Sequence, residues 1–559
     1  MPKTSVQITW EVIDPEARAD STATVTTAQP FSKLDRLRTE DTSQGNYATL
    51  EFNQWSLDGS KTILPDDDAE VNAVWWSTTL SDDSGNFTPD PVMTVTFTEP
   101  HRSLGITFVF DELNFDFVNR LRIDWYAGLT QLDSQEFQPD APVYFAQNSV
   151  TDYDRLVITF YSTNKPHRLL KLVDLIYGAR RSLRDELIAA SLLEQISPIA
   201  NELAINTSRF SLLASDIDVL NPDGITDMLM RGQPVHISGT VDGVTRPLAT
   251  HYLSEWESAN NAVSEMSAVD LLGMLEQVSF PGDIYTGVSA GTLIDEIFTI
   301  FDPLNVKYEL SPTLAGELLS GWLPKCTLRE ALRQIVFALG AIAVTSRSGV
   351  VRILRETEYR ALRSIGSDRR SMSQTVRAAP HLTDITVNAH KYALGTEVKE
   401  IYRDIPAATG EMTVELTAPH GQFSVSNATI VRYNANSVTI DVPNATRTVT
   451  VRASVYEDAQ VPVTRSDPAR TAELRQTVEI TDATLLDETR AAAAAERLFG
   501  YYSGRLSSEF DLVILGDERP GDTAQVWQSD VRELSGVIEA MDTDLVGGFV
   551  SSVKIGGGR

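Results

Sequence analysis

The pattern Gly287-Val-Ser289-Ala-Gly291 matches the G-x-S-x-G nucleophile elbow of serine hydrolases. A serine becomes a nucleophile there only when a buried strand feeds a sharp turn that exposes its hydroxyl beside a base. The preceding residues, Asp283-Ile-Tyr-Thr286, form only a short run, and half of them are polar. We therefore interpret Ser289 as the N-cap of a following helix, and a cell-wall hydrolase that uses Ser289 is the weakest alternative for the function.

The remaining ligand-type residues do not have the spacing of a metal site. The acidic runs Asp66–Asp68 and Asp82-Asp83 lack the twelve-residue EF-hand pattern and are better interpreted as solvated turns. The single cysteine, Cys326, excludes both an intrachain disulfide and a thiolate cage. The histidines show neither H-x-H nor H-x-x-x-H spacing: His101, His167, His236, His251, His381, His390 and His420. We expect no catalytic residue, no metal and no cofactor.

Two aromatic pairs, Trp75-Trp76 and Trp125-Tyr126, raise the question of sugar binding. Exposed aromatic rings can stack against sugars, whereas in a β-sandwich the usual place of an aromatic side chain is the core. A glycan-binding adhesin that uses Trp75, Trp76, Trp125 and Tyr126 is therefore kept as an alternative function.

Charge and hydropathy exclude several classes of protein. The chain has 47 Lys and Arg against 77 Asp and Glu, a formal net charge of −30. This charge repels phosphate backbones, so we expect no nucleic acid bound over the surface. No run of about 18 apolar residues is present, which predicts no membrane span. The N-terminal segment lacks the apolar core of a secretory signal, so we expect synthesis in the cytoplasm.

At 559 residues the chain is long enough for about four domains. Residues 1–178 contain short alternating runs, such as Ile106-Phe108-Phe110 and Leu156-Ile158-Phe160, separated by polar turns. This pattern predicts an N-terminal β-sandwich. Residues 179–280 follow with alternating strands at Leu248–Trp256 and Val263–Val269, and with a hairpin turn at Val241-Asp-Gly243. They predict a small antiparallel barrel.

Residues 281–360 predict an α/β domain. Thr327 and Glu330 form a T-x-x-E capping box. The apolar positions that follow recur at helical spacing, and Gly340 is expected to end the helix. A further helix is predicted over Thr292–Phe301, and a hairpin over Ala341–Leu354.

The rest of the chain returns to β-structure. Residues 361–404 and 471–559 predict a second barrel, which also carries a long helix over 483–502 with five consecutive alanines. Residues 405–470 predict a β-rich subdomain inserted into it. The expected fold class is thus multidomain and mainly β: a β-sandwich, then two antiparallel barrels with inserted α/β and β subdomains.

Residues 177–354 resemble tail proteins of Gram-positive siphophages and prophages that belong to the baseplate-hub superfamily, some of which carry a β-sandwich ahead of the hub. The resemblance is carried by an ordered series of segments along the chain: Leu193-Glu-Gln-Ile-Ser-Pro-Ile-Ala, Asn221-Pro-Asp-Gly-Ile, Arg231-Gly-Gln-Pro-Val, His251-Tyr-Leu-Ser-Glu-Trp256, Ser267-Ala-Val-Asp-Leu-Leu-Gly273, Gly291-Thr-Leu-Ile-Asp-Glu-Ile297 and Gly321-Trp-Leu-Pro-Lys-Cys-Thr-Leu. The closing segments Arg519-Pro-Gly-Asp522 and Gly536-Val-Ile-Glu539 look like the last strands of the second hub barrel.

The resemblance implies a structural hub of a tail tip or baseplate, and not an enzyme. It implies a homotrimer whose six barrels match a sixfold tail, with the distal tail ring, the tail tube and the tape measure protein as partners. Receptor-binding proteins or a cell-surface glycan are further partners to consider. The expected location is a virion or phage-like particle, after synthesis in a bacterial host. Because the chain ends at Arg559, just after the last predicted strand, we expect no trailing peptidase or fibre.

Overall fold

The computed structural model describes most of the chain, and everything below refers to these residues: 4–38, 45–49, 51–52, 54–56, 58–63, 73–183, 187–213, 232–260, 263–301, 308–345, 347, 349–359, 361–366, 368–467, 477–514, 517–529 and 532–558. Strands make up 57% and helices 13% of the structure, so the protein is mainly β, as the sequence predicts. The chain divides into two compact units, one built on Thr9–Ser182 and a larger one that includes Pro234–Arg559.

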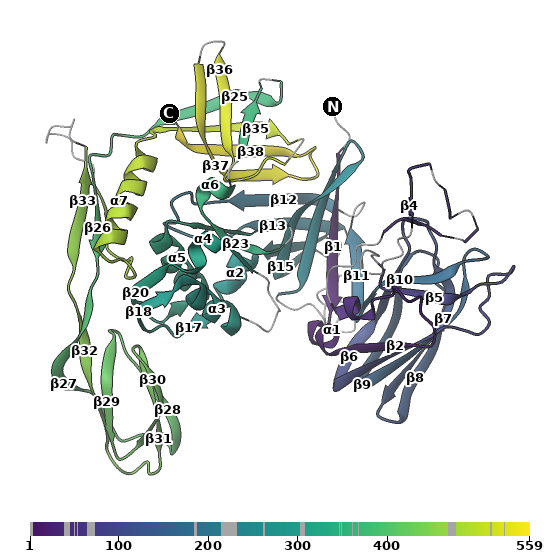
Figure 1. Cartoon of the computed structure of the whole chain (residues 1–559), viewed down its shortest axis with the longest axis horizontal. Helices are drawn as coiled ribbons and strands as arrows, with labels where there is room; N and C mark the ends of the chain where they lie inside the picture. The colour runs from purple at the N-terminus through teal and green to yellow at the C-terminus, as the bar shows by residue number, and fades with distance from the viewer. Residues whose placement is uncertain are drawn as a thin grey trace. The chain divides into compact units, whose positions relative to one another are not determined.

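The N-terminal unit is one sheet with strand order β5-β10-β6-β9-β7-β8, and β2 pairs with β6 (Figure 1). The strands are β2 (Thr22–Val25), β5 (Trp75–Leu80), β6 (Val92–Phe110), β7 (Val118–Ala127), β8 (Thr130–Phe137), β9 (Val143–Thr163) and β10 (Leu169–Ile176). The smaller elements are α1 (Pro15–Asp20), η1 (Leu34–Arg38), β3 (Tyr47–Ala48) and β4 (Thr62–Ile63).

The two longest strands fold this sheet into a sandwich. The pairing of β6 with β9 shifts register between Thr96 and Gly105, and such irregularities bend a strand. One core lies between the two halves. Phe160 of β9 makes edge contacts with Trp75 of β5 and Phe108 of β6, at 5.5 and 6.1 Å between ring centroids. The aromatic side chains therefore hold the sandwich together.

A buried ion cluster joins the segment around Glu51 to this sandwich. The Lys171 ammonium lies 2.7 Å from the Glu51 carboxylate, 3.5 Å from that of Asp111 and 3.6 Å from that of Asp116. All four side chains are at most 2% exposed. Because burying a charge costs free energy unless it is paired, this cluster is stable only when its members are present together.

In the larger unit, the strands predicted as the first barrel and those predicted as the second barrel belong to one 13-stranded sheet, and we keep the two names for its two halves. The first barrel has β1 (Thr4–Ile13) and β11 (Gly178–Leu183) at its edge, and these two strands pair with each other. Its other strands are β12 (Leu187–Gln195), β13 (Thr207–Leu213), β14 (Pro234–Val241), β15 (Val244–Asn260) and β16 (Val263–Val269). The predicted hairpin at Val241-Asp-Gly243 is confirmed, with positive φ at Asp242 and Gly243. The turn at Asn221-Pro-Asp-Gly224 and the short helix expected after it lie outside the described residues.

An α/β segment follows the first barrel. Its elements are α2 (Leu271–Leu275), β17 (Ser279–Phe280), β18 (Ile284–Ser289), α3 (Ala290–Ile300), β19 (Tyr308–Leu310), α4 (Pro312–Ala315), β20 (Leu318–Trp322), β21 (Cys326–Thr327), α5 (Leu328–Leu339), β22 (Ile342–Thr345), β23 (Val351–Leu354) and α6 (Glu356–Tyr359). The predicted start of α5 is confirmed, because the Thr327 hydroxyl accepts the Glu330 N–H at 3.1 Å. Gly340 ends the helix in the left-handed conformation, and β22 and β23 form the predicted hairpin.

The second barrel consists of β24 (Leu362–Ile365), β25 (Arg370–Ala378), β35 (Leu506–Val513), β36 (Thr523–Ser529), β37 (Arg532–Asp544) and β38 (Val550–Gly558). The long helix is α7 (Glu488–Tyr502), five residues shorter at its start than predicted. Asp487 caps it and Leu485 and Leu486 are buried before it begins, so apolar spacing alone placed the start too early.

The insertion between β25 and β35 has two parts. A three-stranded sheet, β33-β26-β34, packs against α7. It consists of β26 (Asp384–Ala389), β33 (Val461–Ser466) and β34 (Thr477–Ile480). Beyond it lies a small sandwich of two sheets with its own core. Its strands are β27 (Tyr392–Asp404), β28 (Gly410–Glu415), β29 (His420–Ser426), β30 (Thr429–Asn434), β31 (Ser437–Val442) and β32 (Val449–Asp458).

The predicted start of the insertion at residue 405 is wrong. Strand β27, over Tyr392–Asp404, pairs with β32 of the small sandwich and not with a strand of the second barrel. The polar segment after Asp404 is a turn inside the insertion, and the sequence pattern made it look like a domain boundary. Figure 1 shows this small sandwich as a separate lobe of the larger unit.

Candidate functional site

The two barrels have the same strand order. In the first barrel the spatial order is β14-β15-β16-β13-β12, and in the second it is β36-β37-β38-β35-β25. Numbered within each barrel along the chain, both orders read third, fourth, fifth, second, first. All these neighbours are antiparallel. Each barrel also has an added strand beside its third one, β1 on β14 and β24 on β36. The chain therefore contains a structural duplication.

The duplication extends to single residues. Tyr252 of β15 pairs on one side with Pro234 and on the other with Val269. Val537 of β37 pairs in the same way with Thr523 and Gly556. Both long strands then shift register after the next residue, between Leu253 and Glu255 and between Ile538 and Ala540. The bulge thus falls at the same place in both barrels, which fixes Tyr252 and Val537 as equivalent positions.

A repeated pattern of buried side chains supports the same alignment. Strand β13 carries Ser208, Phe210 and Leu212, and β35 carries Ser508, Phe510 and Leu512. All six residues are at most 3% exposed. Phe210 lies opposite Met266, and Phe510 lies opposite Val553, at equivalent positions of the last strands. The two barrels therefore have cores of the same design.

The barrels join edge to edge in one place. Strand β12 of the first barrel pairs antiparallel with the second half of β37, from Ser191 opposite Asp544 to Gln195 opposite Ala540. Leu192 lies on the inner face of this junction and is 2% exposed. The junction is heterologous, because the first strand of one barrel meets the fourth strand of the other.

Two buried titratable groups occur in the first barrel and its junction with the α/β segment. The Asp270 carboxylate accepts the Gly273 N–H and the Thr345 hydroxyl, at 3.0 and 2.8 Å. Burial raises the pKa of Asp270 to about 6. His251 is hydrogen-bonded to Ser208 at 3.0 Å, and burial lowers its pKa to about 3. In the second barrel the equivalent of His251 is a glycine, Gly536, and Ser508 is hydrogen-bonded to Gln374 instead.

The G-x-S-x-G serine is a helix cap, as interpreted from the sequence. Ser289 Oγ accepts the Thr292 N–H at 3.2 Å and lies 2.7 Å from the Thr292 hydroxyl. No histidine is hydrogen-bonded to Ser289 in the described part of the chain. Ser289 of this motif therefore serves as the N-cap of α3. Cys326 is no better placed as a nucleophile, because burial raises the pKa of its thiol to about 12.

Three of the four aromatics predicted to face a glycan are in the core. Trp75 and Trp125 are fully buried and Trp76 is 3% exposed. Trp75 and Trp125 face the core of the sandwich. Trp76 follows Trp75 in β5, so it points to the opposite face, where it packs with Tyr47 and Ala73. Tyr126 is half-buried under the Arg155 guanidinium, 4.3 Å from its ring centroid. Three of the four side chains are therefore buried, and two of these lie in the sandwich core.

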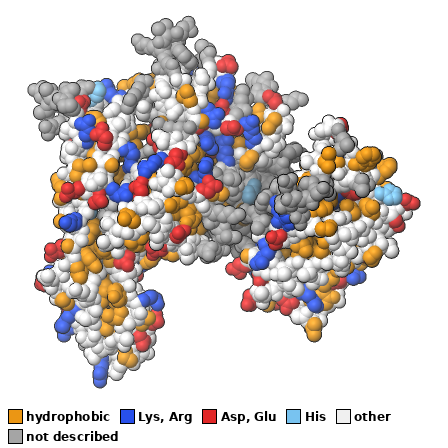
Figure 2. All heavy atoms as spheres, in the orientation of Figure 1, with side chains coloured by type: hydrophobic (Ala, Val, Ile, Leu, Met, Phe, Trp, Pro, Cys, Tyr) orange, Lys and Arg blue, Asp and Glu red, His pale blue; other side chains and the backbone are white. Residues whose placement is uncertain are grey.

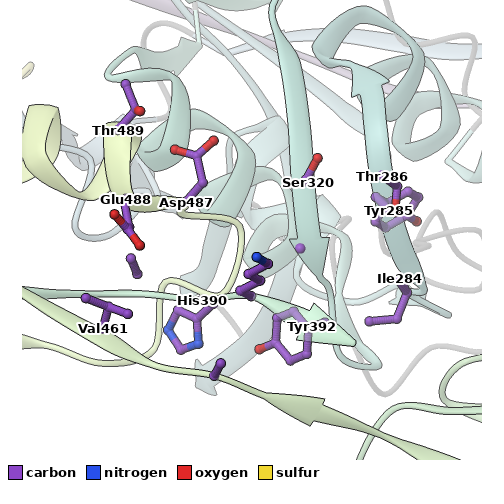
Figure 3. Close-up of a pocket in the computed structure, with 14 residues that line it drawn as sticks. Ile284, Tyr285, Thr286, Ser320, His390, Tyr392, Val461, Asp487, Glu488 and Thr489 are labelled. Atoms are coloured by element: carbon purple, nitrogen blue, oxygen red, sulfur yellow. The ribbon is translucent and has the colours of Figure 1, made fainter. Parts of the chain in front are cut away.

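A cavity of about 520 Å³ lies between the α/β segment, the start of α7 and the base of the insertion (Figure 3). His390 and Tyr392 line one wall, with parallel rings 6.1 Å apart between centroids. The His390 Nδ1 lies 2.8 Å from the Asp458 carboxylate. Burial and this carboxylate raise the pKa of Tyr392. Ser320, on the opposite wall, accepts the Gly287 N–H.

The acidic turns do not form a metal site in the described structure. Asp82 accepts the N–H groups of Ser84 and Asn86 at 2.8 Å, as a solvated turn does. The run Asp66–Asp68 lies outside the described residues. Over the described ranges no group of three or more His, Cys, Asp or Glu is placed to hold a metal ion. Within the same ranges no helix combines the length and apolar character needed to cross a bilayer.

The residues that define the duplication were not recognised as a set from the sequence. The pattern Ser-x-Phe-x-Leu occurs at Ser208 and again at Ser508, and a search for internal repeats would have found this signal. It is short, and the insertions between the strands differ in length. The matched bulges carry no sequence signal of their own and required the structure.

Comparisons with known proteins found similarity only among solved structures. No family model matches the chain, and no curated protein matches its sequence. Among solved structures, a tail protein from Neisseria meningitidis matches with a TM-score of 0.40 and 9% identity, over 67% of this chain and 93% of that one. A 43 kDa prophage tail protein from Shewanella oneidensis matches with 0.40 and 11%, over 67% and 93%. A prophage tail protein from Listeria monocytogenes matches with 0.38 and 8%, over 68% and 91%. The chain is thus similar, at low identity, to bacterial tail proteins, two of which come from prophages.

Proposed function

We propose that this protein is a structural hub of a phage or phage-like tail tip. The observation that carries the proposal is the internal duplication, in which two barrels of one strand order share a register and a core pattern. Three copies of such a chain offer six near-equivalent barrels, so a threefold ring can sit against a sixfold tube. Its task is symmetry matching and closure of the tube until the tail meets a cell.

The proposed partners follow from that position. The barrel ring contacts two further copies of the chain, the distal tail ring and the tail tube, and it surrounds the end of the tape measure protein. The formal net charge of −30 opposes a nucleic-acid role. On the face drawn in Figure 2, basic side chains of the larger unit are interspersed with acidic ones and do not form one basic patch.

We propose that the chain acts without catalysis. Ser289 is engaged in capping α3, and His390 is paired with Asp458. The N-terminal sandwich, with a core of its own, serves as an accessory module of the tail tip.

The experiment that tests the hub is location of the subunit in assembled particles. Particles from a producing bacterium that carries a peptide tag at residue 1 are purified, and the tag is visualised by gold labelling in negative-stain images. We expect label at the tube end opposite the capsid, and loss of closed tails when the gene is deleted. A chain absent from purified particles, or label along the whole tube, contradicts the proposal.

A further inference from the structure

A second cavity, of about 600 Å³, lies in the larger unit between the C-terminal end of α5 and one face of α7. Its apolar lining residues include Leu318, which is 60% exposed, and the buried Leu339 and Ala494. Small-molecule sites are cavities of this size, in which an apolar wall is combined with a few polar groups. The polar groups of this cavity therefore indicate what it can bind.

Three arginine side chains line the cavity, and each donates to a carbonyl group at the end of α5. These bonds run from Arg355 to Leu339, from Arg490 to Ala338 and from Arg497 to Phe337, at 3.4, 3.1 and 3.0 Å. The last carbonyl groups of a helix have no partner within it, and the helix dipole favours cations there. However, a helix end carries only about half a negative charge. Capping of α5 therefore accounts for the position of the arginines and leaves their charges unbalanced.

The carboxylates that line the cavity are fewer than the arginines. Among the described residues they are Glu317 and Asp487. Glu317 is shared, because it is paired with Arg355 and also lies 3.2 Å from Arg490. Asp487 caps α7 by accepting the Arg490 N–H at 2.8 Å. The cavity therefore has an excess of positive charge, although the whole chain has a formal net charge of −30.

Arg497 is the arginine without a carboxylate partner in the described structure. Its guanidinium is bonded to the Phe337 carbonyl and lies 5.1 Å from the centroid of the Phe337 ring. Its Nε is buried without a hydrogen-bond partner, and burial lowers the pKa of Arg497 to about 10. Both observations are expected of a cation that has left water without an anion to replace the lost hydration.

Gly340 makes room for this guanidinium. A Cβ on Gly340 would meet the Arg497 Nη1, so a larger residue at the end of α5 would displace it. Within the described chain Nη1 has no hydrogen-bond partner. A guanidinium presents its N–H groups as a planar fork that matches two oxygens of a carboxylate or a phosphate. An oxyanion can thus supply both the acceptor and the charge that Arg497 lacks.

We propose that this cavity binds a small organic oxyanion, which is a carboxylate or phosphate group on an apolar body. The Arg497 guanidinium binds the oxyanion, beside the positive charges of Arg355 and Arg490. The apolar body packs against the wall that includes Leu318 and Leu339. The site goes beyond the hub role and does not depend on it, since the three arginines belong to one chain.

Titration calorimetry of the full chain tests the proposal, at fixed ionic strength with chloride as the buffer anion. The probes are phenyl phosphate and benzoate, which share a ring and differ in the oxyanion, and their counterparts without a ring, inorganic phosphate and acetate. We expect at least one of the two aromatic anions to bind, about tenfold more tightly than its counterpart, because burial of the ring adds apolar stabilisation. The aromatic anion that binds more tightly identifies the head group.

Two substitutions should change the affinity in opposite directions. Arg497→Met removes the charge but keeps an apolar side chain, and it should raise the dissociation constant by about tenfold or more. Glu317→Gln removes the carboxylate that competes for two arginines, and it should lower the dissociation constant by about fivefold. Arg465→Met is the matched control, because the Arg465 guanidinium lies over the ring of Phe499 at 4.8 Å and outside the cavity. We expect no change in affinity from it.

A merely structural role of Arg497 gives a different result. If Arg497 only caps α5, Arg497→Met lowers the melting temperature and no anion binds. If the cation is uncompensated, the melting temperature of the anion-free chain stays the same or rises.

The proposal is overturned if neither aromatic anion binds, if anions bind equally well with and without the ring, or if Arg497→Met and Arg465→Met have equal effects on binding. Circular dichroism shows whether each variant is folded. Should Arg497→Met not fold, Glu317→Gln decides, because an unchanged or raised dissociation constant contradicts an oxyanion beside the arginines.

Discussion

The two barrels share one strand order but differ at their edges and in their buried polar groups. Strand β12 pairs with β37, whereas its counterpart β25 pairs only with β35 among the residues that the structure describes. The buried serine of the first barrel is hydrogen-bonded to His251 of the fourth strand. The buried serine of the second barrel is hydrogen-bonded to Gln374 of the first strand. The duplicated strand order therefore determines where a buried serine hydroxyl needs a hydrogen-bond partner, but not which strand supplies that partner.

The largest losses of stability are expected at the core positions that the two barrels share. Phe210→Ala and Phe510→Ala each remove a ring that is at most 3% exposed, and each should lower the free energy of unfolding by roughly 3–5 kcal/mol. Urea unfolding, followed by circular dichroism, measures both. If one variant is nearly neutral, the two cores are not of the same design.

Substitutions in the two equivalent strands β12 and β25 should have unequal effects on stability. Leu192→Ser places a polar side chain in the buried junction and should cost roughly 2–4 kcal/mol. Val376→Ser, at the equivalent position of β25, where the side chain is 41% exposed, should change the stability of the dilute single chain by less than about 0.5 kcal/mol. The measurement is urea unfolding below the concentration at which copies associate. Equal losses would show that β25 is already covered within one chain.

Acid sensitivity should be a property of the first barrel. The folded chain keeps His251 neutral with a pKa of about 3, whereas in the unfolded chain the imidazole gains its proton near pH 6.5. Protons therefore favour the unfolded state as the pH falls below 6.5. From pH 7 to pH 5 this group should remove about 2 kcal/mol of stability. His251→Gln should abolish that slope in a pH series of urea unfolding, and an unchanged slope would contradict this assignment.

Asp270 should act with the opposite sign and a smaller size. Its folded pKa is about 6, so the folded state binds a proton that the unfolded carboxyl releases near pH 4. Stability from this group therefore rises as the pH falls through 6. Between pH 7 and pH 5 the gain should be about 1 kcal/mol. Asp270→Asn keeps a capping oxygen and should make the chain more acid-sensitive. The same pH series checks this expectation.

The parts predicted from the sequence are those fixed by local physics. The capping box at Thr327 and the glycine at Gly340 bound α5 because the first amides and last carbonyls of a helix need partners nearby. The turn at Asp242-Gly243 is equally local. These signals lie within a few residues of the structure they determine.

The parts that were missed depend on distant contacts. The strand over Tyr392–Asp404 belongs to the insertion because it pairs with β32, more than forty positions later. Trp75 is buried because it packs against Phe160 of β9. Trp76 is buried on the other face of β5, where it contacts Phe31 and Tyr47. These partners lie far from the tryptophans along the chain, and the sequence of the pair is equally compatible with an exposed platform. The exposure of Val376 is informative only beside its buried counterpart, Leu192.

The insertion also has a consequence for how the chain folds. Strands β25 and β35 are neighbours in the second barrel, yet the whole insertion separates them along the chain. Closing so long a loop costs entropy and slows folding. The small sandwich of the insertion has its own core and can form first, which joins Tyr392 to Asp458 and shortens the loop that remains between Ala378 and Leu506. The second barrel should therefore be the last part of the larger unit to fold during synthesis, since its final strands also leave the ribosome last.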